Sequence, residues 1–410
     1  MRQQLDLIKD QAYALEEQLN KWRRHFHQYP ELSFQESQTS DYIVEVLESL
    51  NVFTIERGIA KHGIIATITK GSGPVIGIRA DMDALPITEQ NDLPYTSAYP
   101  GVMHACGHDA HMAILLGVAV LVASDYQTEN FRGTVKLIFQ PAEEDTDIDG
   151  KTGAPYFIEA GLTKQVDAFL ALHMCPWQRT GSIQVNKGAS MANVDNFCLT
   201  IMGKGGHGGY PHESKDPIWM LGFVLQGLYG VISRKIDPLE VGTISVGKVS
   251  GGQNPNIIPD TVKIIGTIRS YSDKVRKQLI KEIDQVAQLV YSFEGDYQFE
   301  IESGEPVLDN NDQLIDMIEN AGLSLFPGME ISHAPYGMGG EDFGHFTKEI
   351  PGAMFFLGCA QSEETKHSLH ASDFMLDEAA LSIGTGIIKA TIDSYFREYY
   401  TTERLLNENC

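Results

Sequence analysis

The chain has 410 residues and a formal net charge of −24 at pH 7. Compact domains usually contain roughly 100–200 residues, so more than one is expected. The negative charge argues against nucleic acid and anionic membranes as partners, because both would repel the protein.

Residues 1–20 are polar and predict an amphipathic helix, which differs from the apolar core of a secretory signal. The longest apolar run, residues 113–123, is shorter than the ~20 residues that span a bilayer. The cysteines are odd in number and widely scattered, which does not suit a disulfide framework: Cys106, Cys175, Cys198, Cys359 and Cys410. We therefore expect a cytoplasmic protein with reduced thiols and no membrane segment.

Apolar strand patterns alternate with a helical pattern in the outer parts of the chain. A helix is expected at residues 109–124, and strands are expected at 64–69, 75–79, 134–140, 168–172 and 353–358. This alternation predicts an α/β catalytic domain with a central mixed sheet. In open α/β sheets, ligands bind beyond the carboxyl ends of the strands.

The middle of the chain has a different order of elements. Strands are expected at 196–202, 243–249, 261–269 and 297–302, and helices at 217–233 and 272–293. The order β-α-β-β-α-β is that of a ferredoxin-like α+β unit. We therefore predict an inserted domain at residues 193–303, between two parts of a catalytic domain at 1–192 and 304–410.

Cys106 and His108 are separated by a single residue, Gly107, which lets both side chains turn to one centre. Sulfur and nitrogen ligands at this density suit a transition metal. The alternative is a buried thiol beside a helix-capping imidazole. His104 and His111 lie close by, and we expect each to support the site or to be purely structural.

Two adjacent carboxylates, Glu143 and Glu144, follow the predicted strand at 134–140. One of them could ligate a metal while the other acts as general base on an activated water, although such a pair can also form a solvated turn. His173 follows the strand at 168–172 and is either a ligand or a core residue.

Further candidates are weaker as single residues. Either His370 or His367 could ligate near the C-terminus, and either Asp83 or Asp81 could orient a ligand imidazole. His207 lies in a Gly-rich loop, where it could project towards a ligand or simply belong to a flexible segment.

Segments at these and other positions resemble one family in order and spacing: residues 23–33, 81–86, 106–109, 141–144, 205–212, 256–260, 339–343 and 369–374. The chain resembles the M20 metallopeptidases, and within them the amidohydrolases that include hippurate hydrolases, indole-acetyl-amino-acid hydrolases and N-acetyl-amino-acid deacetylases. The resemblance extends over nearly the whole chain.

The resemblance implies a site with two divalent metal ions, and its pattern favours His370 over His367. The implied ligands are Cys106, His108, Glu144, His173 and His370. It also implies that Glu143 is the general base. We count Asp83, which could orient a ligand imidazole, among the catalytic residues together with Glu143 and His207. Thiolate and imidazole ligands favour zinc, with manganese, cobalt or nickel as alternatives.

The resemblance further implies that the inserted domain forms a homodimer and that His207 reaches the active site of the partner subunit, where it polarises the substrate carbonyl. Asn256 and Arg269 match positions expected to contact the substrate. The planar guanidinium of Arg269 suits a bidentate contact with a carboxylate.

The implied reaction is hydrolysis of an N-acyl amino acid, with acetyl as the expected acyl group, to a carboxylic acid and a free amino acid. A dipeptidase or aminopeptidase is the alternative among enzymes, and would need an anionic contact for a free amine. A metal-binding dimer without catalysis is the alternative from another class.

Overall fold

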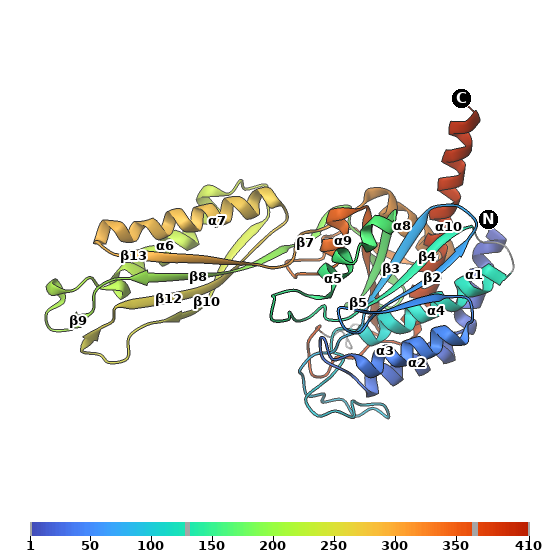
Figure 1. Ribbon diagram of the computed structural model, residues 1–410, viewed down its shortest axis with the longest axis horizontal. Coiled ribbons are helices and arrows are strands. Elements are labelled where there is room, and N and C mark those ends of the chain that lie inside the picture. Colours follow the sequence, from blue (N-terminus) through green and yellow to red (C-terminus); the bar gives the residue numbers. More distant parts are fainter. Residues whose placement is uncertain (1, 128–131, 363–367, 409–410) are drawn as a thin grey trace. The chain divides into compact units, whose positions relative to one another are not determined.

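The computed structural model describes residues 2–127, 132–362 and 368–408. The chain forms two compact units, which Figure 1 draws with the sequence running from blue to red. Unit 1 comprises Met1–Gly188, Asp309–Tyr336 and His345–Cys410, and unit 2 comprises Ala189–Leu308 and Gly337–Gly344.

Unit 1 is built on an eight-stranded mixed sheet. The strand order is β1 (Thr54–Ile59), β2 (Gly63–Lys70), β4 (Gly133–Gln140), β3 (Val75–Asp81), β5 (Ala168–Arg179), β16 (Gly352–Ala360), β6 (Ser182–Gln184) and β15 (Glu330–Ser332). The central strands β4, β3, β5 and β16 are parallel, whereas β1 and β2 pair antiparallel at one side. The predicted α/β class with a mixed sheet is confirmed.

One face of this sheet carries helices that share a single apolar core with it. They are α1 (Arg2–Ala14), α2 (Glu16–Gln28), α3 (Ser37–Ser49), α4 (His108–Gln127), α8 (Asp312–Leu325) and α10 (Ala379–Glu408). The N-terminal region therefore contains two helices, where the sequence predicts one at residues 1–20. The chain makes a turn at Leu15 between them.

The other face is also covered, since the residues of β5 alternate between two environments. Leu170 and Leu172 belong to the core beneath the helices, whereas Phe169 packs against Phe346 with ring centroids 4.9 Å apart. Phe346 belongs to α9 (Gly344–Glu349). Short elements complete the chain: α5 (Gly153–Glu159), η1 (Leu162–Gln165), β7 (Gly188–Met191) and β14 (Leu308–Asn310).

Helix α4 lies at the centre of this core and is apolar on all sides. In the described part of the chain it alone is long and apolar enough to cross a membrane, but most of it is buried inside the fold. It packs against β3, β5, α2 and α10. Its composition therefore follows from burial on every side, as expected for a core helix.

Unit 2 contains a four-stranded antiparallel sheet with two helices on a separate apolar core. The strand order is β10 (Gly242–Ser250), β12 (Thr261–Ser270), β8 (Asn193–Met202) and β13 (Asp296–Ser303). The helices are α6 (Pro217–Lys235) and α7 (Asp273–Ala287). A short pair, β9 (Gly206–His207) and β11 (Ile257–Ile258), and a turn of 3₁₀-helix, η2 (Pro211–Glu213), lie in the connections.

Local sequence explains where these helices begin. The Asp216 carboxylate accepts the N–H of Ile218 at 2.8 Å, and Pro217 occupies the first helical position of α6. Ser272 caps α7 in the same way. The helix predicted at residues 272–293 is α-helical only to Ala287 and continues as the 3₁₀-helix η3 (Gln288–Phe293).

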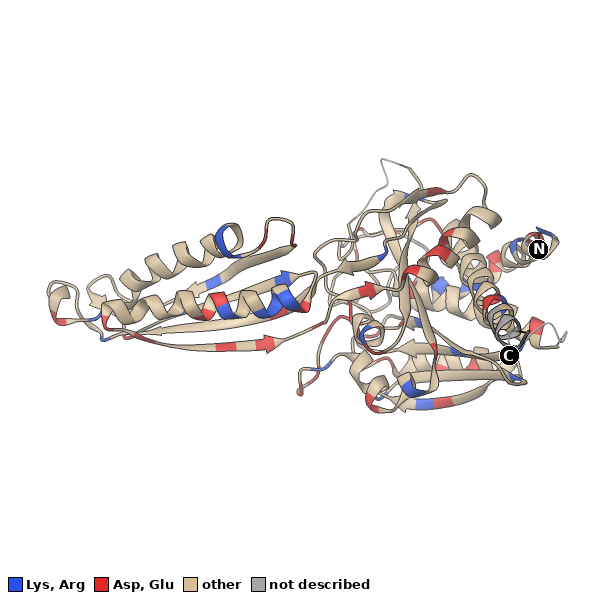
Figure 2. Cartoon of the chain, turned by 90° about the horizontal axis from the view of Figure 1, so that it is seen from above, with Lys and Arg blue, Asp and Glu red and all other residues tan. Residues whose placement is uncertain are grey.

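Charged residues are distributed over both units. Figure 2 shows Lys and Arg singly or in short groups, interspersed with Asp and Glu. Because acidic residues outnumber basic ones by 55 to 31, the field around the protein is negative.

Candidate active site

Separate segments of unit 1 supply the predicted metal ligands. Cys106 and His108 lie where the chain enters α4, Glu144 follows β4, and His370 lies in the loop after β16. His173 lies inside β5, which is longer than predicted because it remains paired with β16 as far as Arg179. The parallel central strands thus direct these segments to one edge of the sheet.

The structure brings the five predicted ligands together. The Sγ atom of Cys106 lies 3.5 Å from Nε2 of His173, and Nε2 of His370 lies 3.1 Å from Oε1 of Glu144. Three overlapping groups each have ligand atoms within 4.8 Å of one another: Cys106–His108–His173, Cys106–Glu144–His370 and His108–Glu143–Glu144. Cys106, His108 and Glu144 are each shared by two of these groups, which suits neighbouring ions with a common ligand.

The two buried imidazoles turn the same nitrogen to this cluster. Nδ1 of His108 donates to the main-chain oxygen of Asp83 at 2.9 Å, and Nδ1 of His173 donates to that of Met174 at 2.9 Å. Nε2 is therefore the unprotonated nitrogen in each neutral ring. Nε2 of His108 is buried without a hydrogen-bond partner, so a metal ion would satisfy it.

The carboxylates of the cluster attract positive charge. Burial alone would lower the pKa of His108, but Asp81, Asp83 and Glu144 raise it to about 10. Burial, together with Glu144 and Glu143, raises the pKa of the Cys106 thiol well above its ordinary value. A thiolate here needs an adjacent cation, which a bound metal supplies.

Asp83 supports two of the candidate ligands. Its main-chain oxygen holds His108, whereas its carboxylate Oδ1 lies farther from Nδ1 of His108, at 3.4 Å. The Oδ2 atom accepts the N–H of Glu144 at 3.0 Å and the hydroxyl of Ser33 at 2.6 Å. No local sequence pattern connects Ser33 with Asp83, so the sequence alone does not indicate this contact.

His111 and Asp81 are occupied by other contacts. Nδ1 of His111 contacts Asp81 at 2.6 Å, and its Nε2 accepts the N–H of Met174 at 2.9 Å. Both ring nitrogens of His111 are thus used, so it supports the site without a free ligand atom. Asp81 also binds Arg79 at 2.6 Å. His104 is buried nearby.

His370 differs from the other candidates in its exposure and its backbone. Its side chain is half-exposed, and its φ angle of 61° is unusual for a residue other than glycine. The N–H of His370 donates to the main-chain oxygen of Ala105 at 2.8 Å, which ties this loop to the segment of Cys106. His367 lies outside the described residues.

A buried ionic network holds the start of α4. Arg23 and His27 of α2 each contact Oδ2 of Asp109 at 2.8 Å. Burial would raise the pKa of Asp109, but the charge of Arg23 and the hydrogen bond from His27 hold it well below its ordinary value. Because Asp109 follows His108 directly, the network fixes the backbone that carries this ligand.

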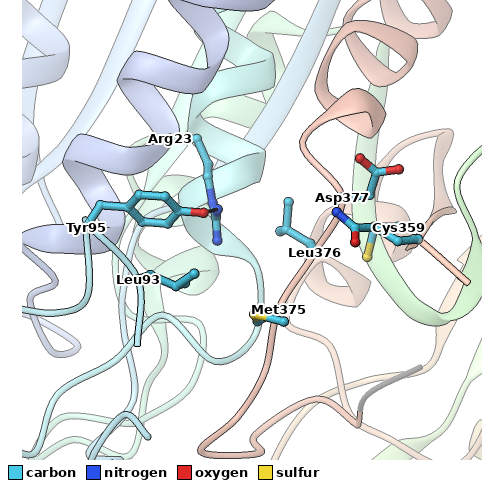
Figure 3. A pocket seen from close by; sticks show the side chains of 8 residues that line it. Arg23, Leu93, Tyr95, Cys359, Met375, Leu376 and Asp377 are labelled. Carbon is cyan, nitrogen blue, oxygen red and sulfur yellow. Dashed lines mark hydrogen bonds between the residues drawn. The ribbon is translucent and has the colours of Figure 1, made fainter. Parts of the chain in front are cut away.

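A cavity of about 220 Å³ lies beside Arg23. Figure 3 shows Arg23 and Tyr95 next to each other, with Leu93 and Met375 close by. The cavity is lined by Arg23, Leu93, Tyr95, Cys359, Gln361, Met375, Leu376 and Asp377. None of the predicted ligands is among these residues, so the cavity is separate from the cluster.

In unit 2 the structure brings His207 and Asn256 close together. His207 lies in β9 opposite Ile257 of β11, and the N–H of Gly208 donates to the main-chain oxygen of Asn256 at 2.8 Å. The side chains of both His207 and Asn256 are exposed. Nδ1 of His207 accepts the N–H of Gly209 at 2.9 Å, which leaves Nε2 as the protonated nitrogen of the neutral ring.

Arg269 lies in β12 of the four-stranded sheet, at the end of that strand away from the β9–β11 pair. In the pairing of β12 with β8, Thr261 faces Met202 whereas Arg269 faces Val194. Eight residues of extended strand correspond to about 26 Å. Figure 1 shows β9 beyond the Met202 end. The structure therefore does not bring Arg269 together with His207 and Asn256 within one chain.

Known proteins resemble the chain over nearly its full length. Residues 77–394 match the family described as Peptidase family M20/M25/M40. The chain belongs to this family. The M20 assignment is confirmed by N-acetyl-L-cysteine deacetylase of Bacillus subtilis, which is 37% identical over 97% of this chain and 90% of its own length.

Two further relatives narrow the class of this M20 protein. Hippurate hydrolase of Campylobacter jejuni is 34% identical, over 90% of this chain and 94% of its own. A crystal structure of a dinuclear metal-binding M20 peptidase from Bacillus subtilis has a TM-score of 0.82 and 33% identity, covering 94% of this chain and 99% of that one. The chain is accordingly an amidohydrolase, and the predicted enzyme class is confirmed.

Proposed function

We propose that this M20 enzyme hydrolyses N-acyl amino acids, with acetyl as the preferred acyl group, to a carboxylic acid and a free amino acid. The observation that carries the proposal is the position of Glu143. Its Oε2 lies 4.0 Å from Nε2 of His108, which is itself 3.9 Å from Oε1 of Glu144. A carboxylate thus lies beside the candidate ligands, as a general base must.

We assign the metal ligands to Cys106, His108, Glu144, His173 and His370. This donor set suits zinc best, while manganese, cobalt and nickel remain candidates for the active ion. When bound, two such ions would lower the pKa of water from ~15.7 towards ~7 and polarise the amide carbonyl. The unpartnered Nε2 of His108 supports this assignment.

Glu143 accepts the proton of the attacking water and passes it to the leaving nitrogen as the C–N bond breaks. One water is consumed, and its hydroxyl remains on the acyl carbon. Asp83 holds His108 and Glu144 in place during these steps. Removing a general base typically lowers the rate by roughly 10²–10⁴-fold.

We infer that His207 of the partner subunit donates a hydrogen bond to the substrate carbonyl oxygen. The support is that Arg269 lies about 26 Å along β12 from Thr261, and that β9 with His207 lies beyond the Thr261 end of the strand. His207 and Asn256 are therefore too far from Arg269 for one small molecule to contact all three within one chain. In a homodimer, Arg269 of one chain could hold the substrate carboxylate while His207 and Asn256 come from the other chain.

Unit 2 supplies the surface for this homodimer. Large apolar side chains are exposed on α6, and the most exposed are Ile218, Trp219, Phe223 and Tyr229. Exposed apolar surface of this kind marks an interaction site. We place the enzyme in the cytoplasm, which agrees with free thiols at the four described cysteines.

The experiment that tests the function uses protein stripped of metal and reloaded separately with zinc, manganese, cobalt or nickel. Release of free amino acid is measured from N-acetyl, N-benzoyl and longer N-acyl amino acids, and from dipeptides with a free amine. Metal-dependent release from the N-acyl compounds supports the proposal. Faster cleavage of the dipeptides would identify a peptidase. If metal is bound but no amino acid is released from any compound, the protein is a metal-binding dimer without catalysis.

A further inference from the structure

The fully buried carboxyl of Glu36 connects two segments that lie far apart in the sequence. Glu36 immediately precedes α3. Its Oε1 accepts the N–H of Phe34 at 3.0 Å and the N–H of Ala142 at 2.8 Å. Glu36 belongs to none of the candidate metal-binding groups.

Both donors have a strained backbone. Phe34 has a φ angle of 62° and Ala142 one of 55°. A side chain with a Cβ atom disfavours this left-handed region, so surrounding contacts must hold such residues there. Conformations of this kind persist where the structure over-determines them, and they gather at functional sites.

Ala142 directly precedes Glu143 and Glu144, so its conformation sets the direction of both carboxylates. The turn is held from other sides as well. The main-chain oxygen of Ala142 accepts the N–H of Gly153 at 2.7 Å, and the N–H of Glu144 donates to Asp83. A Cβ atom at Gly153 would lie 1.8 Å from the main-chain oxygen of Pro141, so this close approach requires glycine.

We propose that Glu36 is a positioning residue that holds Ala142 in its left-handed conformation and thereby aims Glu143 and Glu144 at the metal ions. The inference rests on the proposed function for the roles of these two residues. Glu36 acts through the backbone and does not touch the reacting atoms. Its loss should therefore reduce the rate of the chemical step more than it reduces substrate binding.

The test compares Glu36→Ala with Glu36→Gln, because glutamine keeps one acceptor oxygen in the same place. Glu31→Ala is the matched control. The Glu31 carboxylate also accepts two backbone N–H groups near the start of α3, from Gln38 and Thr39, but does not contact the turn. Glu36→Met removes the acceptor while keeping the volume, and serves if the alanine variant does not fold.

We expect Glu36→Ala or Glu36→Met to lower kcat on the order of 10²-fold with little change in KM. Hydrogen exchange at the amides of residues 142–144 should become faster in the same variants. The affinity for metal should fall roughly 10–100-fold, as is typical when a residue that orients metal ligands is replaced. The variants Glu36→Gln and Glu31→Ala should each differ from the parent by no more than about a few-fold in every measurement.

Unchanged kcat and unchanged exchange in both acceptor-less variants would overturn the inference. An equal loss in Glu31→Ala would also overturn it, since the effect would then come from the start of α3. Failure of the proposed function looks different. The parent protein would release no amino acid, whereas exchange at residues 142–144 would still report whether Glu36 holds the turn.

Discussion

At the residue scale, Glu143 and Glu144 are adjacent in sequence but have separate proposed tasks. Both are part-buried, and each comes within 4.0 Å of Nε2 of His108. Two carboxylates with different surroundings can act as ligand and as base only if the turn before them sends the side chains in different directions. We attribute those directions to the left-handed conformation of Ala142, whose φ angle is 55°.

Glu143→Gln should keep both metal ions and lose turnover by roughly 10²–10⁴-fold, because the amide cannot accept the proton of water. The neighbouring change Glu144→Gln is the control and should release metal as well as activity. Metal content by mass spectrometry and initial rates measure the two effects. Turnover close to that of the parent in Glu143→Gln would contradict the assignment of the base.

The stability of the metal-free protein should decrease as the pH rises, because of Glu36. Burial, and then the charge of Asp83, raises the pKa of Glu36 from 4.5 to about 8. Between these values the folded state binds a proton that the unfolded state has lost. The free energy of unfolding therefore decreases as pH rises, by at most about 1.4 kcal/mol per pH unit.

Glu36→Gln should remove this part of the pH dependence, because glutamine does not titrate. The measurement is the thermal midpoint of both proteins at intervals from pH 5 to pH 8, a range that covers most of the shift. The parent should lose stability relative to the variant across that range. Parallel curves would show that Glu36 titrates at its ordinary pKa.

At the element scale, α6 has two apolar faces. Met220, Val224 and Leu228 are buried against the sheet of unit 2, whereas Trp219 and Phe223 are exposed by 56% and 40%. The spacing of four residues places the exposed pair on one side of the helix. A helix that is apolar all round is normally covered on both sides, so a second surface is expected to cover this one.

Trp219→Glu should convert the proposed dimer to monomer, because a charge would be buried at the interface. Leu7→Glu in α1 of unit 1 is the control, since Leu7 is similarly exposed, by 55%. Light scattering after size exclusion gives the mass of each variant. An unchanged mass for Trp219→Glu, or a monomeric parent, would contradict the use of this face.

At the scale of the whole molecule, an active site shared between subunits makes a specific prediction about mixed dimers. Glu143→Gln and His207→Ala chains should each be inactive alone. If His207 acts on the partner subunit, a mixed dimer contains one site with Glu143 and His207 both intact. Random assortment makes half of the dimers mixed, so about a quarter of the parent activity should return.

The two variants are co-expressed with different tags, and the mixed dimer is purified before its rate is measured. A purified mixed dimer should have about half of the parent activity per dimer, since one of its two sites is complete. Mixing Glu143→Gln with Glu144→Gln is the control and should restore nothing. Absence of activity in the first mixture would show that His207 acts within its own chain.

The class of the fold and the candidate residues follow from local patterns in the sequence. Apolar periodicity is a local property, so the core helix at 109–124 and the strands at 134–140 and 261–269 could be predicted from their own residues. The chemistry of ligands is local as well. A thiol, imidazoles and adjacent carboxylates near strand ends indicate a metal site without any knowledge of contacts.

The way in which those residues are held follows from long-range contacts of the folded chain. The bond from Glu36 to Ala142 spans 106 residues of chain, and no pattern on either side indicates it. The choice of nitrogen in His108 depends on the main-chain oxygen of Asp83, and both nitrogens of His111 are occupied by distant partners. Such hydrogen bonds follow from long-range packing, which the local sequence does not contain.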